Sequence, residues 1–363
     1  MARIEPRDHG YVSEPMLAAA GASRAQLLDL ATPGNLQAPP GALLDTLFRT
    51  ALNTYPDPQA LAARTAIATR LGCEPEAILL GNGSSELLWI CGRALAEPDA
   101  SVLVVMPGPG ELTAGARAGG ARVVQWRAVE RTGHAVDLQQ IAELIALEKP
   151  VLANLSAPAW PSGAPVYFRD LQLLAASFPD VRFVIDHSEL EVSELHSELT
   201  LAPPPNVLYV RSIGKALGLQ GLRVGYLWAQ PALCAFLESR RPSFSTNSLA
   251  HAAAELWPSQ AEFIGACRSR LLEDRTRLAG LLGELGLAPT PSVTGALLVR
   301  VTRASQVAHD LLLHWQIAVR DCSVCGLPDH LRISGVSSED APRLLRALGE
   351  VLAQRGISGG REG

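Results

Sequence analysis

Residues 212–225 read SIGKALGLQGLRVG and place one of the chain's few lysines, Lys215, in a run of glycines. Arg223 follows in the same run, and the spacing is S-x-x-K-x-x-G-x-x-G-x-R-x-G. A lysine on a solvated helix face needs no such surroundings. A lysine that reacts covalently must be neutral part of the time, and burial or neighbouring cations lower its pKa. The pattern therefore predicts a reactive lysine in a confined turn.

Short apolar runs alternate with helix-like segments from about residue 60 to residue 230. The runs expected to be strands are residues 77–82, 101–108, 121–126, 150–156, 182–187, 207–212 and 223–229. Residues 84–97 and 137–150, which lie between such runs, have helical spacing. This alternation favours an α/β fold, with a mostly parallel central sheet and helices on both faces. Ligands of such sheets bind beyond the carboxyl ends of the strands.

The pattern changes after residue 235, and we divide the chain there. Longer helical patterns over residues 249–286 lead into two strand candidates, 296–301 and 330–334, and a closing helix over 340–354. We expect an N-terminal arm (1–35), a large cofactor-binding α/β domain (36–235) and a small C-terminal α+β domain (236–363).

Composition narrows the class of partner. The chain has 363 residues, 48% of them hydrophobic and 18% charged, with a formal net charge of −5. No bulk positive field favours nucleic acid or an anionic membrane, so we expect a small-molecule substrate. The N-terminal residues lack the apolar core of a secretory signal, and no run reaches the roughly 20 apolar residues of a membrane span. These features predict a cytoplasmic protein.

The cysteine pattern does not predict a disulfide framework. Six cysteines are scattered along the chain, and only Cys322 and Cys325 form a C-x-x-C, in RDCSVCGL. That pair suits a redox-active dithiol or half of a metal site, but no second C-x-x-C or paired histidine accompanies it. We expect two reduced thiols and no metal.

Two polar motifs follow strand candidates in the large domain. Gly83, Ser84 and Ser85 in LLGNGSSELL open a predicted helix, where backbone amides, hydroxyls and the helix dipole favour a phosphate. Serine is also a common N-cap, so a purely structural role stays open. Asp186 ends the strand candidate in FVIDHSE, where a carboxylate can orient a loop or hold a protonated ring nitrogen of a cofactor.

Taken together in this order, the phosphate loop, Asp186, Lys215 and Arg223 resemble the fold-type-I pyridoxal-phosphate enzymes of the class I/II aminotransferase superfamily. The resemblance covers essentially the whole chain and implies pyridoxal 5′-phosphate as cofactor. It implies that Lys215 reacts with the cofactor aldehyde and later transfers protons, and that Asp186 pairs with the pyridinium nitrogen. It also implies that Ser84, Ser85, Ser212 and Arg223 hold the cofactor phosphate.

Local similarity narrows the group. GNGSSELL and LNTYPDPQALAARTAIATRLG resemble histidinol-phosphate aminotransferases, in which the tyrosine of a YPD motif reaches the cofactor phosphate of the partner subunit. Tyr55 matches that tyrosine, which implies a homodimer with shared active sites. The alternative is a tyrosine packed in the core.

Three further stretches are similar to the threonine-phosphate decarboxylase group, a sister of those aminotransferases. They are DHGYVSEPMLAAAG, LDLATPGNLQAPP and VRDCSVCGLPDHLRIS. By that resemblance His9, Asn35 and Arg320 are candidates for the substrate site. In both groups the arginine of LRIS, here Arg332, binds the substrate carboxylate, which suits a bidentate guanidinium. A surface ion pair is the alternative for Arg332.

Three positions depart from the family pattern, all at the cofactor ring. Trp160 stands where an asparagine donates to the ring hydroxyl, Glu189 stands where a tyrosine does so, and Pro109 replaces the stacking aromatic. Trp160 can stack or donate its indole N–H instead, whereas Glu189 can donate only when it is protonated.

Three functions are compatible with this sequence. The first is an aminotransferase of the histidinol-phosphate type acting on a small, phosphorylated or unphosphorylated, amino acid or amine. The second is an L-threonine-O-3-phosphate decarboxylase-like enzyme of cobalamin biosynthesis. In both, the bond that breaks is the one aligned with the ring π system. The third is a degenerate, ligand-binding homodimer.

Overall fold

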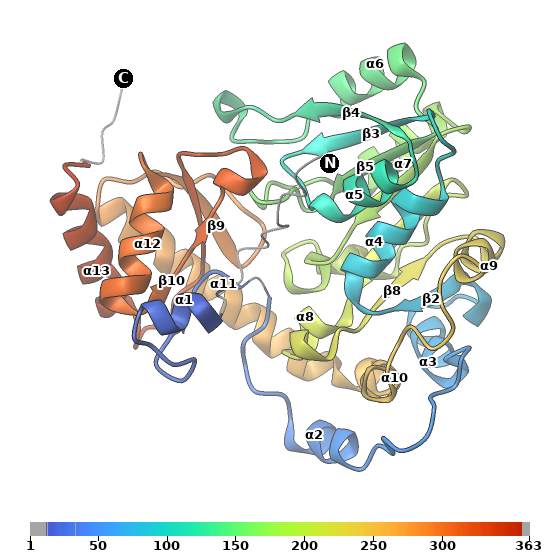
Figure 1. The fold of residues 1–363 in the computed structure, drawn as a ribbon, viewed down its shortest axis with the longest axis horizontal. Helices are drawn as coiled ribbons and strands as arrows, with labels where there is room; N and C mark the ends of the chain where they lie inside the picture. Colours follow the sequence, from blue (N-terminus) through green and yellow to red (C-terminus); the bar gives the residue numbers. More distant parts are fainter. Residues whose placement is uncertain (1–11, 13, 33, 358–363) are drawn as a thin grey trace. The chain divides into compact units, whose positions relative to one another are not determined.

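The computed structural model describes residues 12, 14–32 and 34–357. The chain divides into two compact units (Figure 1). We call residues 34–160 and 165–269 the sheet unit. Among the described residues, the C-terminal unit comprises 12, 14–32, 161–164 and 270–357.

The sheet unit contains a seven-stranded sheet in the order β2-β8-β7-β6-β5-β3-β4. Its strands are β2 (Ile78–Gly81), β3 (Ser101–Met106), β4 (Arg122–Arg127), β5 (Leu152–Ser156), β6 (Arg182–Asp186), β7 (Val207–Ser212) and β8 (Gly225–Trp228). Neighbouring strands from β7 to β4 run parallel, whereas β8 runs antiparallel to both β7 and β2. The predicted mostly parallel sheet is confirmed. Strand β8 is reversed, and the connection of residues 213–224 that leads to it from β7 contains a five-residue helix (Ile213–Leu217) and a 3-10 turn.

Helices cover both faces of this sheet, as the alternation of β7 side chains shows. Leu208 and Val210 join a buried cluster with residues of α4 (Gly83–Ala94) and α5 (Gly110–Ala118). On the opposite face the Tyr209 ring lies 6.1 Å from the ring of Phe168, the first residue of α7 (Phe168–Ser177). The other helices with most or all of their residues in this unit are α2 (Gly41–Phe48), α3 (Leu61–Leu71), α6 (Leu138–Glu148), α8 (Ile213–Leu217), α9 (Pro231–Glu238) and α10 (Ser248–Leu256).

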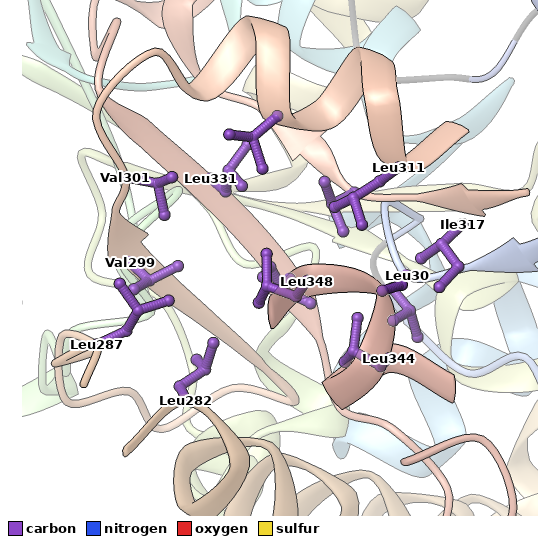
Figure 2. Packing of buried hydrophobic residues seen from close by; sticks show 14 of the residues in the cluster. Leu30, Leu282, Leu287, Val299, Val301, Leu311, Ile317, Leu331, Leu344 and Leu348 are labelled. Atoms are coloured by element: carbon purple, nitrogen blue, oxygen red, sulfur yellow. The ribbon is translucent and has the colours of Figure 1, made fainter. Parts of the chain in front are cut away.

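The C-terminal unit is an α+β structure around a smaller sheet. Strands β11 (Arg320–Asp321), β12 (His330–Ser334) and β9 (Ala296–Arg300) are antiparallel, and β1 (Leu28–Asp29) pairs in parallel with β10 (Ile317–Ala318). Helices α1 (Glu14–Ala19), α12 (Ala304–Trp315) and α13 (Ala341–Gln354) complete it. Leucine, isoleucine and valine side chains of β9, β10, β12, α12, α13 and the second half of α11 (Ala261–Glu284) pack into one core (Figure 2). The predicted β9, β12 and α13 are therefore present.

The compact units differ from the predicted division at residues 35 and 235. Their boundary falls between 269 and 270, within α11 (Ala261–Glu284). Part of the proposed N-terminal arm belongs to the C-terminal unit, because β1 pairs with β10 and Leu30 lies in its core. The division into an arm and two folding domains stays a prediction.

The longer helical patterns predicted over 249–286 form two helices, α10 and α11. Helix α10 ends at Leu256, and a 3-10 turn over Trp257–Gln260 leads into α11. Pro258 lies in that turn. Proline has no N–H to donate, which favours such a break.

The described residues contain no helix that is both long enough and apolar enough to span a bilayer. All six cysteines are free thiols.

Candidate active site

Lys215 lies in a short helix directly after β7. Ser212 caps α8, and its hydroxyl oxygen accepts a hydrogen bond from the Lys215 N–H at 3.3 Å. The helix ends at Gly218, whose φ of +71° is favourable for glycine. A Cβ there would also press on the Gln37 carbonyl. The glycine spacing of the sequence thus reflects a tight turn that holds the lysine at the carboxyl end of its strand.

The Lys215 ammonium lies among polar groups from the segment that follows β6. Its Nζ donates to the Ser188 Oγ at 3.0 Å and lies 3.5 Å from Oε1 of Glu189. About a fifth of the lysine side chain is exposed, against 11% of the glutamate side chain. The amine is therefore partly accessible and oriented from one side.

Asp186 lies at the carboxyl end of β6, next to β7 in parallel register. It is 6% exposed, and its Oδ1 accepts the Ser188 N–H at 2.9 Å. Burial raises the pKa of Asp186, while Lys215 and the Ser188 hydrogen bonds oppose that rise. Its hydrogen bonds come from a neutral serine, and the cation that opposes the rise in its pKa, Lys215, bonds to the same serine.

The predicted phosphate loop opens α4 at the same edge of the sheet. Gly83, Ser84 and Ser85 form the first turn of this helix, where backbone N–H groups have no helical partner. The Glu86 carboxylate accepts the Asn82 N–H at 2.5 Å, a bond that fixes the start of the helix. Arg223 reaches this turn, with its Nη2 at 3.5 Å from the Ser85 Oγ.

One glycine makes room for that arginine, and a second lets the start of α4 approach β8 closely. Gly83 has a φ of +78°, and a Cβ on it would overlap the Arg223 guanidinium. A Cβ on Gly225 would lie 2.9 Å from the Ser84 nitrogen. Strand pairing sets Gly225 opposite Ser212 on β7, so the Arg223 turn, Ser212 and the α4 N-terminus meet at one point. Two serines, a guanidinium and a helix N-terminus are a fitting donor set for a phosphate dianion.

Asn35 holds the lysine turn. Its Nδ2 donates to the Ala216 carbonyl at 3.2 Å, and its backbone N–H donates to the Lys215 carbonyl at 2.9 Å. Its Oδ1 accepts the Gln37 N–H at 2.8 Å. Asn35 is fully buried, and both of these side-chain hydrogen bonds are with backbone groups.

Tyr55 is an exposed residue and not part of the core. Its side chain is 84% exposed, and its ring lies 4.9 Å from that of Phe244. Both rings line an open pocket of about 680 Å³ whose wall includes Asn82, next to the α4 N-terminus.

The three residues that depart from the family pattern all follow carboxyl ends of parallel strands. Pro109 precedes α5 after β3, Trp160 follows β5, and Glu189 follows β6. The structure thus places these positions on the same edge as Asp186 and Lys215.

The predicted substrate arginines belong to the C-terminal unit. Arg320 on β11 pairs in register with Arg332 on β12, and the two are 4% and 2% exposed. The Nε of Arg332 donates to the Pro161 carbonyl at 3.2 Å. The alternative of a surface ion pair for Arg332 does not fit this burial. His9 lies outside the described residues.

Comparison with known proteins decides the family. The model of the family "Aminotransferase class I and II" matches residues 35–348. The chain belongs to this family.

The curated relatives of this aminotransferase agree. A histidinol-phosphate aminotransferase of Burkholderia pseudomallei is 32% identical over 87% of this chain and 89% of the relative. A histidinol-phosphate aminotransferase of Symbiobacterium thermophilum is 30% identical over 84% of each. The predicted group, a pyridoxal-phosphate-dependent aminotransferase of the histidinol-phosphate type, is thus confirmed.

Solved structures share the fold of the aminotransferase. Histidinol-phosphate aminotransferase from Sinorhizobium meliloti, in complex with pyridoxal 5′-phosphate, has a TM-score of 0.87 at 23% identity and covers 98% of this chain and 99% of its own. L-threonine-O-3-phosphate decarboxylase from Porphyromonas gingivalis has a TM-score of 0.79 at 21% identity and covers 90% and 100%.

Sequence reasoning missed Ser188 in this aminotransferase. Its hydroxyl accepts from Lys215 and its N–H donates to Asp186, so it joins the two proposed catalytic residues. The only signal was its position, two residues after Asp186 in DHSE. Serine is too common after strands for that position alone to indicate a role.

Proposed function

We propose that the protein transfers the amino group of a small amino acid or amine, with or without a phosphate, through pyridoxal 5′-phosphate, with Lys215 and Asp186 as catalytic residues. The observation that carries this proposal is the meeting of Lys215 and Asp186 at adjoining ends of parallel strands, joined through Ser188. It agrees with family membership over most of the chain.

The residues at the α4 N-terminus fit the phosphate of this cofactor. Ser84, Ser85 and Arg223 would hold it, with Ser212 at the neighbouring strand end. A Cβ on Gly83 would displace the Arg223 guanidinium from its present position, and the positive φ of Gly83 favours glycine.

When bound, pyridoxal 5′-phosphate supplies an aldehyde for covalent attachment and a protonated ring that accepts electron density from the substrate Cα. A carboxylate beside the ring nitrogen favours the protonated form of that nitrogen. The buried Asp186 would therefore keep the ring nitrogen protonated. Lys215 would bind the aldehyde and move a proton from the substrate Cα. Ser188 orients the Lys215 Nζ from the side of β6.

We assign Trp160 and Glu189 to the cofactor ring. Both follow strands at the edge that carries Asp186. The Glu189 Oε1 lies 3.5 Å from the Lys215 Nζ, so this carboxylate would attract that amine as well as contact the ring.

We assign Arg332 to the substrate carboxylate and Arg320, with His9, to a substrate phosphate. The two arginines are buried cations at paired strand positions, and anionic groups are their natural ligands. Asn35 supports the site by fixing the turn that carries Lys215.

The proposal includes a cytoplasmic homodimer in which Tyr55 reaches the cofactor phosphate of the partner subunit. The exposure of its ring supports a role across an interface, as does that of Phe48 and Leu52, which are 84% and 72% exposed. Sedimentation should give twice the chain mass. A monomer that retains full cofactor affinity would contradict this part.

A substrate assay separates this function from its alternatives. Histidinol phosphate and phosphothreonine are each added to the cofactor-loaded protein, and amine transfer to a 2-oxo acid and release of carbon dioxide are both measured. Amine transfer supports the proposal, whereas carbon dioxide release without transfer supports the decarboxylase. Absence of both, with no absorbance from bound cofactor, supports the non-catalytic dimer.

A further inference from the structure

Cys322 and Cys325 lie on one tight turn of the C-terminal unit. Cys322 precedes a 3-10 turn over Ser323–Cys325, and the Cys325 N–H donates to the Cys322 carbonyl at 3.1 Å. Such a turn brings the first and fourth Cα atoms within about 7 Å. Cα separations of roughly 4.4–6.8 Å suit a disulfide, so the backbone already approaches the required geometry.

The two thiols differ in their surroundings. Cys322 is fully buried, and its Sγ lies 3.9 Å from the Arg320 carbonyl. Cys325 is 7% exposed, its Sγ donates to the Cys322 carbonyl at 3.0 Å, and the intervening Val324 is 53% exposed. Val324 therefore places part of the turn at the surface, and Cys325 is the less buried of the two thiols.

Electrostatics favour a thiolate at the same cysteine. Hydrogen bonding between the two side chains lowers the pKa of Cys325, with Arg320 acting in the same direction and burial opposing both. The same hydrogen bond, together with burial, raises the pKa of Cys322. A thiolate that is stabilised by a second thiol and a guanidinium is the nucleophile of thiol–disulfide exchange.

We propose that Cys322 and Cys325 are a reversible dithiol–disulfide pair, oxidised by small-molecule disulfides such as oxidised glutathione. The Cys325 thiolate attacks one sulfur of the small disulfide, forms a mixed disulfide and releases one thiolate. The Cys322 sulfur then attacks Cys325 Sγ, loses its proton and releases the second thiol. Two electrons pass from the protein sulfurs to the small disulfide, which leaves as two thiols.

The position of the pair links its redox state to strand β11. Cys322 directly follows β11, and its N–H donates to the His330 carbonyl of β12 at 3.1 Å. Oxidation would remove the hydrogen bonds that both thiols make beside Arg320. Arg320 and its cross-strand partner Arg332 are therefore the first residues that the disulfide would displace.

The test compares this pair with a second buried pair. Cys91 and Cys234 lie in the core of the sheet unit, where burial raises the pKa of Cys234 to about 12. The folded protein is equilibrated with graded ratios of reduced to oxidised glutathione from both directions, quenched with acid, alkylated and mapped by mass spectrometry. A synthetic peptide of residues 318–328 serves as the reference dithiol.

We expect Cys322 and Cys325 to form an internal disulfide at glutathione ratios no more oxidising than the reference peptide needs. Cys91 and Cys234 should remain reduced and should therefore be alkylated at every ratio. In Cys322→Ser, Cys325 should incorporate glutathione faster than Cys322 does in Cys325→Ser, because Cys325 is the less buried thiol and its pKa is lowered whereas that of Cys322 is raised. If a variant fails to fold, the transient mixed disulfide of the wild-type protein shows which sulfur reacts first. A pair that stays reduced, or mixed disulfides that accumulate on both sulfurs, would overturn the proposal.

Discussion

Asp186 and Glu191 are buried carboxylates from one segment of the sheet unit, yet their surroundings differ. Burial raises the pKa of both. Glu191 is bound by Arg70 at 2.7 Å and by the Trp257 indole N–H at 2.9 Å, so its charge is compensated within the chain. Asp186 instead accepts hydrogen bonds from the neutral Ser188, and the cation that opposes the rise in its pKa is Lys215, itself a proposed catalytic residue. The difference separates a carboxylate that stabilises the fold from one that is ready to hold a cation of a ligand.

The substitution with the largest expected effect on this comparison is Asp186→Asn. Asparagine keeps the size of the side chain but removes the charge that would hold a protonated ring nitrogen, so we expect kcat to fall by about a thousandfold, or about 4 kcal/mol of transition-state stabilisation. Steady-state kinetics at saturating cofactor measures this loss. A variant that transfers amine within a factor of a few of wild type would contradict the role assigned to Asp186.

The matching change at the other carboxylate is Glu191→Ala. It leaves Arg70 and the Trp257 N–H without their buried partner, so the free energy of unfolding should fall by about 3 kcal/mol. Urea unfolding measures the loss, and kcat per folded molecule should stay close to that of wild type. Arg70→Ala and the double variant close a thermodynamic cycle. Additive losses would mean that the pair is not coupled.

Gly83→Ala tests the predicted phosphate loop at the start of α4, and Gly72→Ala is its control. Both glycines have positive φ, +78° and +70°, but a Cβ on Gly83 would meet Arg223 whereas one on Gly72 meets nothing within 4 Å. Backbone strain is thus matched, and only Gly83→Ala should weaken cofactor affinity, by roughly tenfold, as loss of one charge-assisted hydrogen bond predicts. Equilibrium dialysis of pyridoxal 5′-phosphate measures both variants. Equal losses in the two would assign the effect to strain alone.

The smallest effect concerns the pH dependence of stability. The folded-state pKa of Asp186 is raised, chiefly by burial, so the cofactor-free protein loses stability as the pH rises through that pKa. Below the unfolded pKa of about 3.9 the carboxyl is neutral in both states, and Asp186→Asn should match wild type there. As the pH rises, the variant should become the more stable of the two in thermal unfolding. A difference that does not vary with pH would contradict the raised pKa.

The strands, and the positions of the proposed catalytic residues on them, could be predicted from the sequence because they depend on local pattern. Apolar runs marked all seven strands of the main sheet, and parallel order then brought Asp186 and Lys215 to one edge. The family resemblance supplied roles that spacing alone does not give, such as that of Tyr55.

Other features depend on tertiary contacts and left no pattern. Strands β1, β10 and β11 have two residues each, too few for a period of alternation to show. Asn35 resembles a substrate residue, and its bond to the carbonyl of Ala216, 181 positions further along the chain, could not be foreseen. The boundary between the two compact units falls within α11 because each half of this helix packs within a different unit. The helical periodicity of the sequence continues through both halves and gives no sign of that boundary.

The central claim is that Lys215 is the residue that binds the cofactor covalently, and it can be tested directly. The purified protein is loaded with pyridoxal 5′-phosphate, reduced with borohydride, digested and mapped by mass spectrometry. The chain's other lysine, Lys149, is exposed at the end of α6 and serves as an internal control. We predict a reduced adduct on the peptide that contains Lys215, none on that of Lys149, and none in Lys215→Ala. An adduct on Lys149 alone, or no adduct at saturating cofactor, would contradict the account.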